Sequence, residues 1–159
     1  MKVFLSIVFL FLFIGCAAYT PIKETSQLLF TYDYTIDGKT KLELWQSARD
    51  YFKTEYGKDV VQVADETACT ILGNALYEYN GDPLKITSIP CLSEYHIRFM
   101  AKDGKARLQL EIINGKPALS QCGFNLPPEK AYQDMINYFN GISAELKQAL
   151  KSKSGLDNF

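Results

Sequence analysis

The sequence predicts an α+β fold, in which an antiparallel sheet packs one of its faces against two helices. Several segments alternate between apolar and polar residues, as half-buried strands do. Two longer segments carry apolar residues at spacings of three and four, as amphipathic helices do. Their order along the 159 residues is strand, helix, four strands, helix. A single sheet with both helices on the same face buries every apolar stripe in that order.

The first strand is expected from Leu28 to Ile36, where every second residue is apolar or aromatic, and Asp37-Gly38 ends it with a turn signal. The first helix is expected from Thr40 to Tyr56. Thr40 and Glu43 have the spacing of a capping box, in which a hydroxyl and a carboxylate bind backbone amides that the helix leaves unpaired. Its apolar stripe is Leu42, Trp45, Ala48, Phe52 and Tyr56, and Gly57 follows as a C-terminal cap.

Two further strands are expected, from Val60 to Val63 and from Ala68 to Tyr79, with a turn at Asp65-Glu66. Gly73 and Asn74 interrupt the longer of these two strands, which indicates a β-bulge there. A long loop is expected from Asn80 to Leu92 because glycine and proline recur within it.

The next two strands, Glu94–Ala101 and Lys105–Ile113, flank an Asp103-Gly104 turn and predict a hairpin. Pairing of Lys102 with Lys105 separates a dry face from a wet face, which supports this register. The apolar pairs are then Phe99 with Leu108, Ile97 with Leu110 and Tyr95 with Ile112, and the polar pairs are His96 with Glu111 and Arg98 with Gln109.

The last helix is expected after Pro127-Pro128-Glu129, since proline is tolerated in the first turn of a helix. The segment before it, Gly115–Asn125, is expected to be irregular or to form a further short strand. The helical stripe consists of Tyr132, Met135, Ile136, Phe139, Ile142, Leu146 and Leu150. Residues 27–150 thus form one α+β domain, and residues 151–159 are expected to be a frayed polar tail.

The N-terminus predicts export. Lys2 and a short apolar run, followed by small residues, are typical of a signal peptide, here residues 1–15. The run is too short to span a bilayer as a helix. Phe13-Ile14-Gly15-Cys16 resembles a bacterial lipobox, so Cys16 is expected to carry a lipid and residues 16–26 to form a tether. The alternative is cleavage at Ala17 or Ala18, which would release a soluble secreted protein.

The chain has four cysteines. If Cys16 is lipidated, Cys69, Cys91 and Cys122 remain, and they allow at most one disulfide. The hairpin register brings Cys91 and Cys122 to the same end of the sheet, so a bridge between them and two separate thiols both remain open. Cys69 is expected at the opposite end, unpaired. The chain contains no Cys-x-x-Cys motif, and neither a metal nor another cofactor is expected.

The wet face of the hairpin is the candidate binding face. It presents His96, Arg98, Arg107, Gln109 and Glu111. These side chains suit a platform for a protein, a peptide or a glycan, and they equally suit an ordinary solvated sheet face. His96 is the single histidine and has no ligand at metal-binding spacing, so no catalytic residue is assigned. A formal net charge of −1 provides no excess of basic residues of the kind that binds nucleic acid.

A resemblance to a known family is carried by three short segments. They are Lys41-Leu42-Glu43-Leu44-Trp45 with Ala48, Val60-Val61-Gln62-Val63 with Asp65, and Ile71-Leu72-Gly73. The chain resembles, over roughly Leu28 to Leu150, a family of exported bacterial proteins of unknown function with a fold like that of the TATA-binding protein. The resemblance implies that fold and supplies no catalytic residues. It implies no DNA binding either, because a fold does not determine a function.

These observations together predict a lipoprotein of the bacterial cell envelope, expected at the outer membrane, that acts as a non-catalytic binding or structural module. Its expected partners are the membrane, through the lipid, and a protein, peptide or glycan. The alternative is an envelope hydrolase acting on cell-wall or glycan material. A convergent polar pocket with displaced pKa values would favour the enzyme, whereas a flat or concave polar sheet would favour the module.

Overall fold

The computed structural model of the protein describes residues 20–23, 26–81 and 88–152. The predicted signal peptide, the lipidation residue Cys16 and the tail beyond Ser152 lie outside these residues. The elements are β1 Leu29–Thr35, α2 Lys41–Tyr56, a 3₁₀ turn Lys58–Val60, β2 Val61–Asp65, β3 Thr70–Asn80, β4 Pro90–Lys102, β5 Lys105–Ile112 and α3 Glu129–Lys151.

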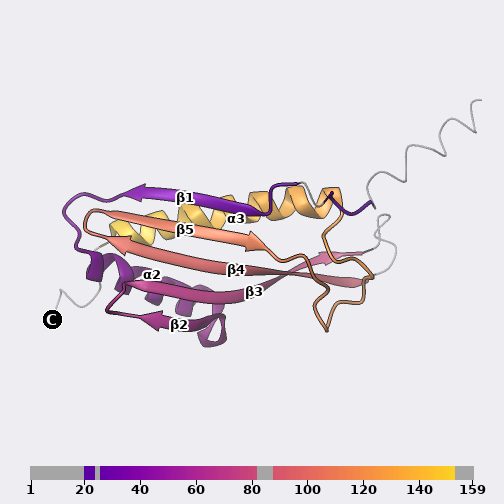
Figure 1. Ribbon diagram of the computed structural model, residues 1–159, viewed down its shortest axis with the longest axis horizontal. Coiled ribbons are helices and arrows are strands. Elements are labelled where there is room, and N and C mark those ends of the chain that lie inside the picture. Colours follow the sequence, from indigo (N-terminus) through magenta and orange to yellow (C-terminus); the bar gives the residue numbers. More distant parts are fainter. Residues whose placement is uncertain (1–19, 24–25, 82–87, 153–159) are drawn as a thin grey trace, which may run out of the picture.

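The five strands form one antiparallel sheet in the order β1-β5-β4-β3-β2. Helices α2 and α3 both lie against the same face of this sheet, and the other face is open (Figure 1). The predicted fold class and the order of its elements are therefore confirmed. No helix in the described part of the chain is long and apolar enough to cross a membrane.

The β4–β5 hairpin has the predicted register. Lys102 pairs with Lys105, and Phe99 pairs with Leu108. The inner face of the hairpin is apolar or aromatic except at Ser93, and its side chains pack against Phe52 of α2 and Phe139 of α3 in one continuous core. Alternation along the two strands thus sets both the pairing and the position of the core.

Helix α2 begins with the predicted capping box. Thr40 Oγ1 accepts a hydrogen bond from the backbone amide of Glu43, and the Glu43 carboxylate accepts one from the Thr40 amide at 2.7 Å. The predicted apolar stripe is wrong at its first residue, because Leu42 is exposed and Leu44 is buried. Leu44 lies one turn before Ala48, so the helix presents a row spaced by four residues to the sheet.

The predicted β-bulge lies on the other strand of its pair. The register shifts between Val61 and Val63, so the extra residue is Gln62 of β2. Gly73 of β3 stands opposite the bulge, and a side chain there would collide with the backbone carbonyl of Val60. Glycine is therefore required at position 73 by this close backbone approach, while β3 itself continues without interruption.

Two other boundaries differ from the prediction. Strand β4 begins at Pro90, within the expected loop, because proline is tolerated at the first residue of a strand. The expected tether also ends early: Ile22 is buried in the core, and its backbone amide donates to the Pro127 carbonyl at 3.0 Å. An apolar side chain beside the start of α3 therefore fixes residues 20–23 to the domain.

Candidate functional site

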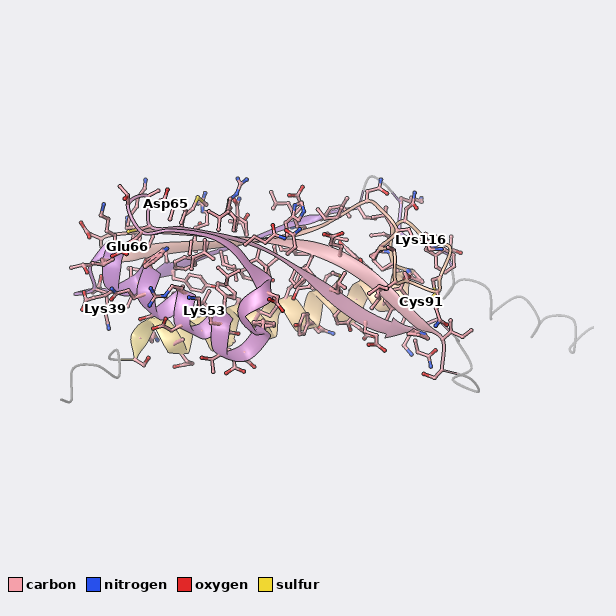
Figure 2. The ribbon with its side chains drawn as sticks, turned by 90° about the horizontal axis from the view of Figure 1, so that it is seen from below. Lys39, Lys53, Asp65, Glu66, Cys91 and Lys116 are labelled. Atoms are coloured by element: carbon pink, nitrogen blue, oxygen red, sulfur yellow. A yellow bond between two sulfur atoms is a disulfide. The ribbon has the colours of Figure 1, made fainter. Side chains whose placement is uncertain are left out.

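The open face of the sheet is the candidate site, and it lies opposite both helices (Figure 2). The open face consists of the outward-pointing residues of the sheet, which the registers define. They are Leu29, Thr31, Asp33, Thr35, Val63, Asp65, Thr70, Leu72, Asn74, Leu76, Glu78, Leu92, Glu94, His96, Arg98, Met100, Lys102, Lys105, Arg107, Gln109 and Glu111.

The five predicted binding residues all belong to the open face. His96 pairs with Glu111 and Arg98 pairs with Gln109, as the hairpin register requires. Arg107 instead binds Asp33 of β1, with its Nε 2.6 Å and its terminal nitrogen 2.9 Å from the two carboxylate oxygens. Hydrogen bonding from this guanidinium holds the pKa of Asp33 below its ordinary value.

Shallow hollows cover the open face. A hollow of about 390 Å³ crosses the middle of the sheet. It is lined by four of the predicted residues, His96, Arg98, Gln109 and Glu111, together with Leu29, Gln62, Leu72, Gly73, Asn74 and Ile97. Arg107 lines a separate hollow of about 520 Å³ near the β4–β5 turn. A third, of about 350 Å³, lies where the loop at Pro117–Leu119 approaches Leu76 and Glu94.

The open face is more apolar than the sequence predicted. Leu72 is 39% exposed and Leu76 is 48% exposed, and both project outward from β3. Leu29, Val63 and the loop residue Leu119 are exposed on or beside the same face. Leu72 and Leu76 were missed because β3 carries apolar residues on both of its faces, so alternation alone does not reveal which side is buried. The hairpin register, extended to β3, would have placed Leu72 and Leu76 outside.

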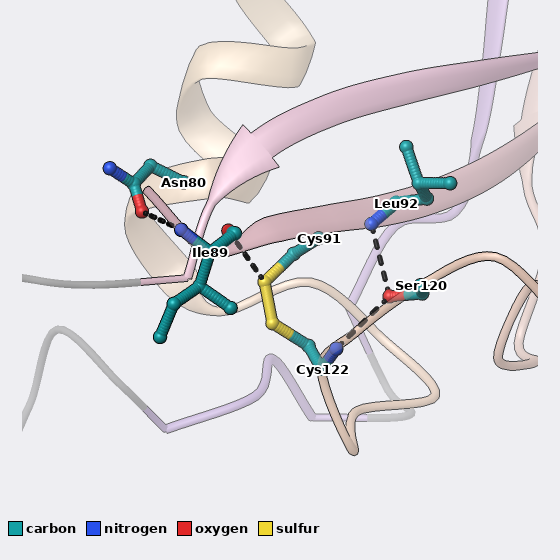
Figure 3. The surroundings of a disulfide bond; sticks show 6 residues. All are labelled: Asn80, Ile89, Cys91, Leu92, Ser120 and Cys122. Carbon is teal, nitrogen blue, oxygen red and sulfur yellow. Dashed lines mark hydrogen bonds between the residues drawn. A yellow bond between two sulfur atoms is a disulfide. The ribbon is translucent and has the colours of Figure 1, made fainter. Parts of the chain in front are cut away.

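The end of the sheet farthest from the β4–β5 turn carries the cysteine pair (Figure 3). The structure joins Cys91 of β4 to Cys122 by a disulfide with a Cα–Cα distance of 5.2 Å. Ser120 supports this junction, since its hydroxyl accepts from the amides of Leu92 at 3.1 Å and Cys122 at 3.4 Å. Cys69, the one free cysteine in the described part of the chain, is buried at the turn before β3.

Tyrosines gather on the other side of the sheet, beneath the helices. Tyr51 of α2 donates to Glu145 of α3 at 3.1 Å, and the hydroxyls of Tyr95 and Tyr138 lie 3.4 Å apart. Burial raises the pKa of Tyr51 and Tyr95 above the ordinary value, and it raises the pKa of Tyr34 to about 12. These phenols remain neutral hydrogen-bonding groups: Tyr51 joins α2 to α3, and Tyr34 and Tyr95 join the sheet to α3.

Metal ligands do not gather anywhere in the described part of the chain: no three His, Cys, Asp or Glu side chains lie close enough to hold an ion. The open face carries exposed apolar side chains, acidic and basic side chains, and side-chain amide groups.

A family profile described as "Domain of unknown function (DUF4468) with TBP-like fold" matches residues 30–115. No curated protein matches the chain. The chain is similar to a crystal structure of a TBP-like protein from Parabacteroides distasonis, with 16% identity, a TM-score of 0.63, and coverage of 87% of this chain and 99% of that one. It is also similar to a DUF4468 family protein from Bacteroides ovatus, with 14% identity, a TM-score of 0.58, and coverage of 85% and 92%. At these identities the likeness establishes the fold.

Proposed function

The chain belongs to the DUF4468 family of domains of unknown function with a TBP-like fold, and from this premise we propose that it is a lipid-anchored, non-catalytic interaction module of the bacterial cell envelope. The open face of the sheet is its interaction surface. The observation that carries the proposal is the exposure of Leu72 and Leu76 among charged side chains, over hollows that cross the sheet. Exposed apolar side chains gathered on one face are typical of interaction sites.

The placement in the envelope rests on the N-terminus and on the cysteine pair. A charged residue, a short apolar run and small residues lead to Cys16. The Cys91–Cys122 disulfide is compatible with an exported protein, because disulfides persist in oxidising compartments. A lipidated Cys16 would bury enough methylene groups to hold the domain at a membrane.

The anchor is tested by a Cys16→Ser variant of the full chain in the producing bacterium. We expect the wild type to fractionate with membranes and to move to the detergent phase, and we expect the variant to be lost from both. The serine variant lacks the thiol that would carry a lipid but keeps the same length and size at that position. Equal recovery of both chains in the membrane fraction would contradict the lipid anchor.

The open face is tested by site-specific photo-crosslinking in intact cells. A photoreactive amino acid at position 96, at the centre of the open face, should give a covalent adduct after illumination. The same amino acid at the position of Asn137, which is exposed on α3, is the matched control and should give none. If position 96 gives no adduct, or if both positions give the same adducts, the open face is not the interaction surface.

A further inference from the structure

We infer that the uncovered part of strand β3 is a second binding site, which takes an extended basic segment of a partner protein as an added strand. This site adjoins the open face but uses the edge of the sheet, and it is additional to the proposed function. The fold leaves backbone groups of β3 without a partner strand here and surrounds them with acidic and aromatic side chains. Addition of a strand to a sheet edge is a general way of binding peptides.

Strand β2 covers only the first part of β3. The last pair between these two strands is Val61 with Gly73. Strand β3 continues beyond Gly73 to Asn80, and along that length β4 is its one neighbouring strand in the described part of the chain (Figure 1). The segment Leu76–Glu78 therefore has one edge against β4 and one edge facing outward, and this outward edge is the free edge.

Two residues of the free edge direct their backbone groups outward. Successive residues of an antiparallel strand direct amide and carbonyl to opposite sides. The Gly81 amide donates to the Ile89 carbonyl at 2.8 Å, so the odd-numbered residues of β3 bond to β4. Leu76 and Glu78 therefore direct their amides and carbonyls away from β4. None of these four groups bonds to another described residue, and both side chains are exposed.

Tyrosine rings line the helix side of the free edge. Tyr77 lies between Leu76 and Glu78 and points to the opposite face of the sheet, where its ring centroid is 5.2 Å from that of Tyr138 on α3. Burial, and then the nearby charge of Asp134, raise the pKa of Tyr77. A side chain opposite Tyr77 in an added strand would reach these rings and Asp134. Arginine suits this position, because its guanidinium stacks on aromatic rings and pairs with carboxylates.

The open-face side of the free edge suits one apolar and one basic residue. Leu76 and Leu119 both line the hollow of about 350 Å³, and Leu119 is 77% exposed. An apolar side chain opposite Leu76 would cover both leucines. Glu78 is exposed and forms no ion pair with the residues that the structure describes. A lysine or arginine opposite Glu78 would form an oppositely charged cross-strand pair.

The carboxylates around the free edge favour a basic partner. Glu78 and Glu94 lie on its open-face side, and Asp134 lies on its helix side. Lys130, the nearest basic residue to Asp134 along α3, makes no ion pair with it. Charge complementarity therefore favours a basic segment over an acidic one. In a strand antiparallel to β3, the order from the N-terminal end is a basic residue, an arginine and an apolar residue.

A second copy of this chain does not fit the free edge. Antiparallel pairing of Leu76 with Glu78 of a second β3 would set the second Gly73 opposite Gly81 of the first copy. Val61 already lies beside Gly73 on that edge, so the second Val61 would coincide with Gly81 of the first copy. Parallel pairing in register would set the second Gly73 where Val61 of the first copy lies. The occupant is therefore a short extended segment of another protein.

The test titrates a synthetic peptide, acetyl-Thr-Lys-Arg-Leu-Thr-amide, into the full exported chain while the amide signals are followed by heteronuclear NMR. At saturating peptide we expect the amides of Leu76 and Glu78 to shift and to exchange with solvent at least about fivefold more slowly, because both gain a hydrogen bond. The Tyr77 amide is already bonded to β4, so its exchange should change less. The control peptide acetyl-Thr-Glu-Glu-Leu-Thr-amide should bind at least about tenfold more weakly.

Two variants at one position test the contact from the protein side. Glu78→Pro removes one outward amide and keeps the bonds to β4, since proline is tolerated on a strand edge, and it should weaken binding of the basic peptide at least about tenfold. Thr31→Pro is the matched control, because the Thr31 amide lies on the outer edge of β1, and it should bind like the wild type. Glu78→Lys leaves the backbone unchanged. It should weaken binding of the basic peptide and strengthen binding of acetyl-Thr-Glu-Arg-Leu-Thr-amide.

Absence of shifts at Leu76 and Glu78 with the basic peptide at millimolar concentration would overturn strand addition at the free edge. Equal binding of the basic and acidic peptides would overturn the basic character of the partner. Equal binding of the basic peptide by the wild type and both position-78 variants would place the peptide elsewhere and overturn the site. The crosslink from position 96 tests the open face on its own, so the failure of one surface is distinguishable from the failure of the other.

Discussion

Replacing Phe139 with alanine is expected to lower the free energy of unfolding by about 3–5 kcal/mol. Phe139 lies at the middle of α3 and is fully buried. Its ring centroid is 5.0 Å from that of Tyr95 on β4 and 5.5 Å from that of Phe30 on β1. The alanine would leave a cavity between α3 and strands that are not adjacent in the sheet, where neighbouring rings have little freedom to fill it. Urea unfolding followed by tyrosine and tryptophan fluorescence measures this loss.

The matched control for Phe139→Ala is Asn137→Ala, an exposed position on the same helix. Its effect should stay within about 0.5 kcal/mol, because no packed side chain is removed. Comparable unfolding midpoints for the two variants would mean that α3 does not form the core as described.

Most of the fold could be predicted from the sequence because local signals and tertiary packing agree. Thr40 and Glu43 start α2 with a capping box that needs no distant residue. The turn at Asp103-Gly104 fixes the hairpin register, and that register places the apolar residues of β4 and β5 on one shared face. Where the prediction failed, the deciding contacts were distant in sequence: Ile22 is fixed by Pro127, and the bulge at Gln62 is matched to Gly73 across the strands.

The candidate site could be predicted only in part. His96, Arg98, Gln109 and Glu111 follow from the hairpin register, and they line one hollow. The exposed leucines of β3 could not be separated from core leucines, since the partner strand and the faces covered by the helices decide their burial.

Replacing Gly81 is expected to have the second large effect on stability, because Gly81 lies against the disulfide. It is buried, and a side-chain carbon built at this position would lie 2.7 Å from Cys122 Sγ and closer still to Cys91 Sγ. Both sulfur atoms are held by the bond between them and have little freedom to move away. Gly81→Ala should therefore lower the free energy of unfolding by about 1–3 kcal/mol, the range for overpacking a rigid site.

The disulfide itself should contribute about 2–4 kcal/mol, because it closes a loop between cysteines 31 residues apart and so restricts the unfolded chain. We expect the Cys91→Ala/Cys122→Ala chain to lose that amount. Urea unfolding of both chains is measured with and without a reductant. The reductant should lower the free energy of unfolding of the wild type and leave that of the double variant unchanged. A wild type that is insensitive to reductant and equal in stability to the double variant would show that no such bond forms.

Introducing Gly81→Ala into the Cys91→Ala/Cys122→Ala chain tests the contact between residue 81 and the two sulfur atoms directly. In the Cys91→Ala/Cys122→Ala background the sulfur atoms are gone, and the methyl group of Gly81→Ala enters the space that they leave. The same substitution should then cost less than about 0.5 kcal/mol, giving a coupling of about 0.5 kcal/mol or more between neighbouring sites. Gly123→Ala is the matched control, because Gly123 adjoins Cys122 and has open space where a side chain would lie. An equal cost of Gly81→Ala in both backgrounds would mean that the backbone at Gly81, and not the two sulfur atoms, requires glycine.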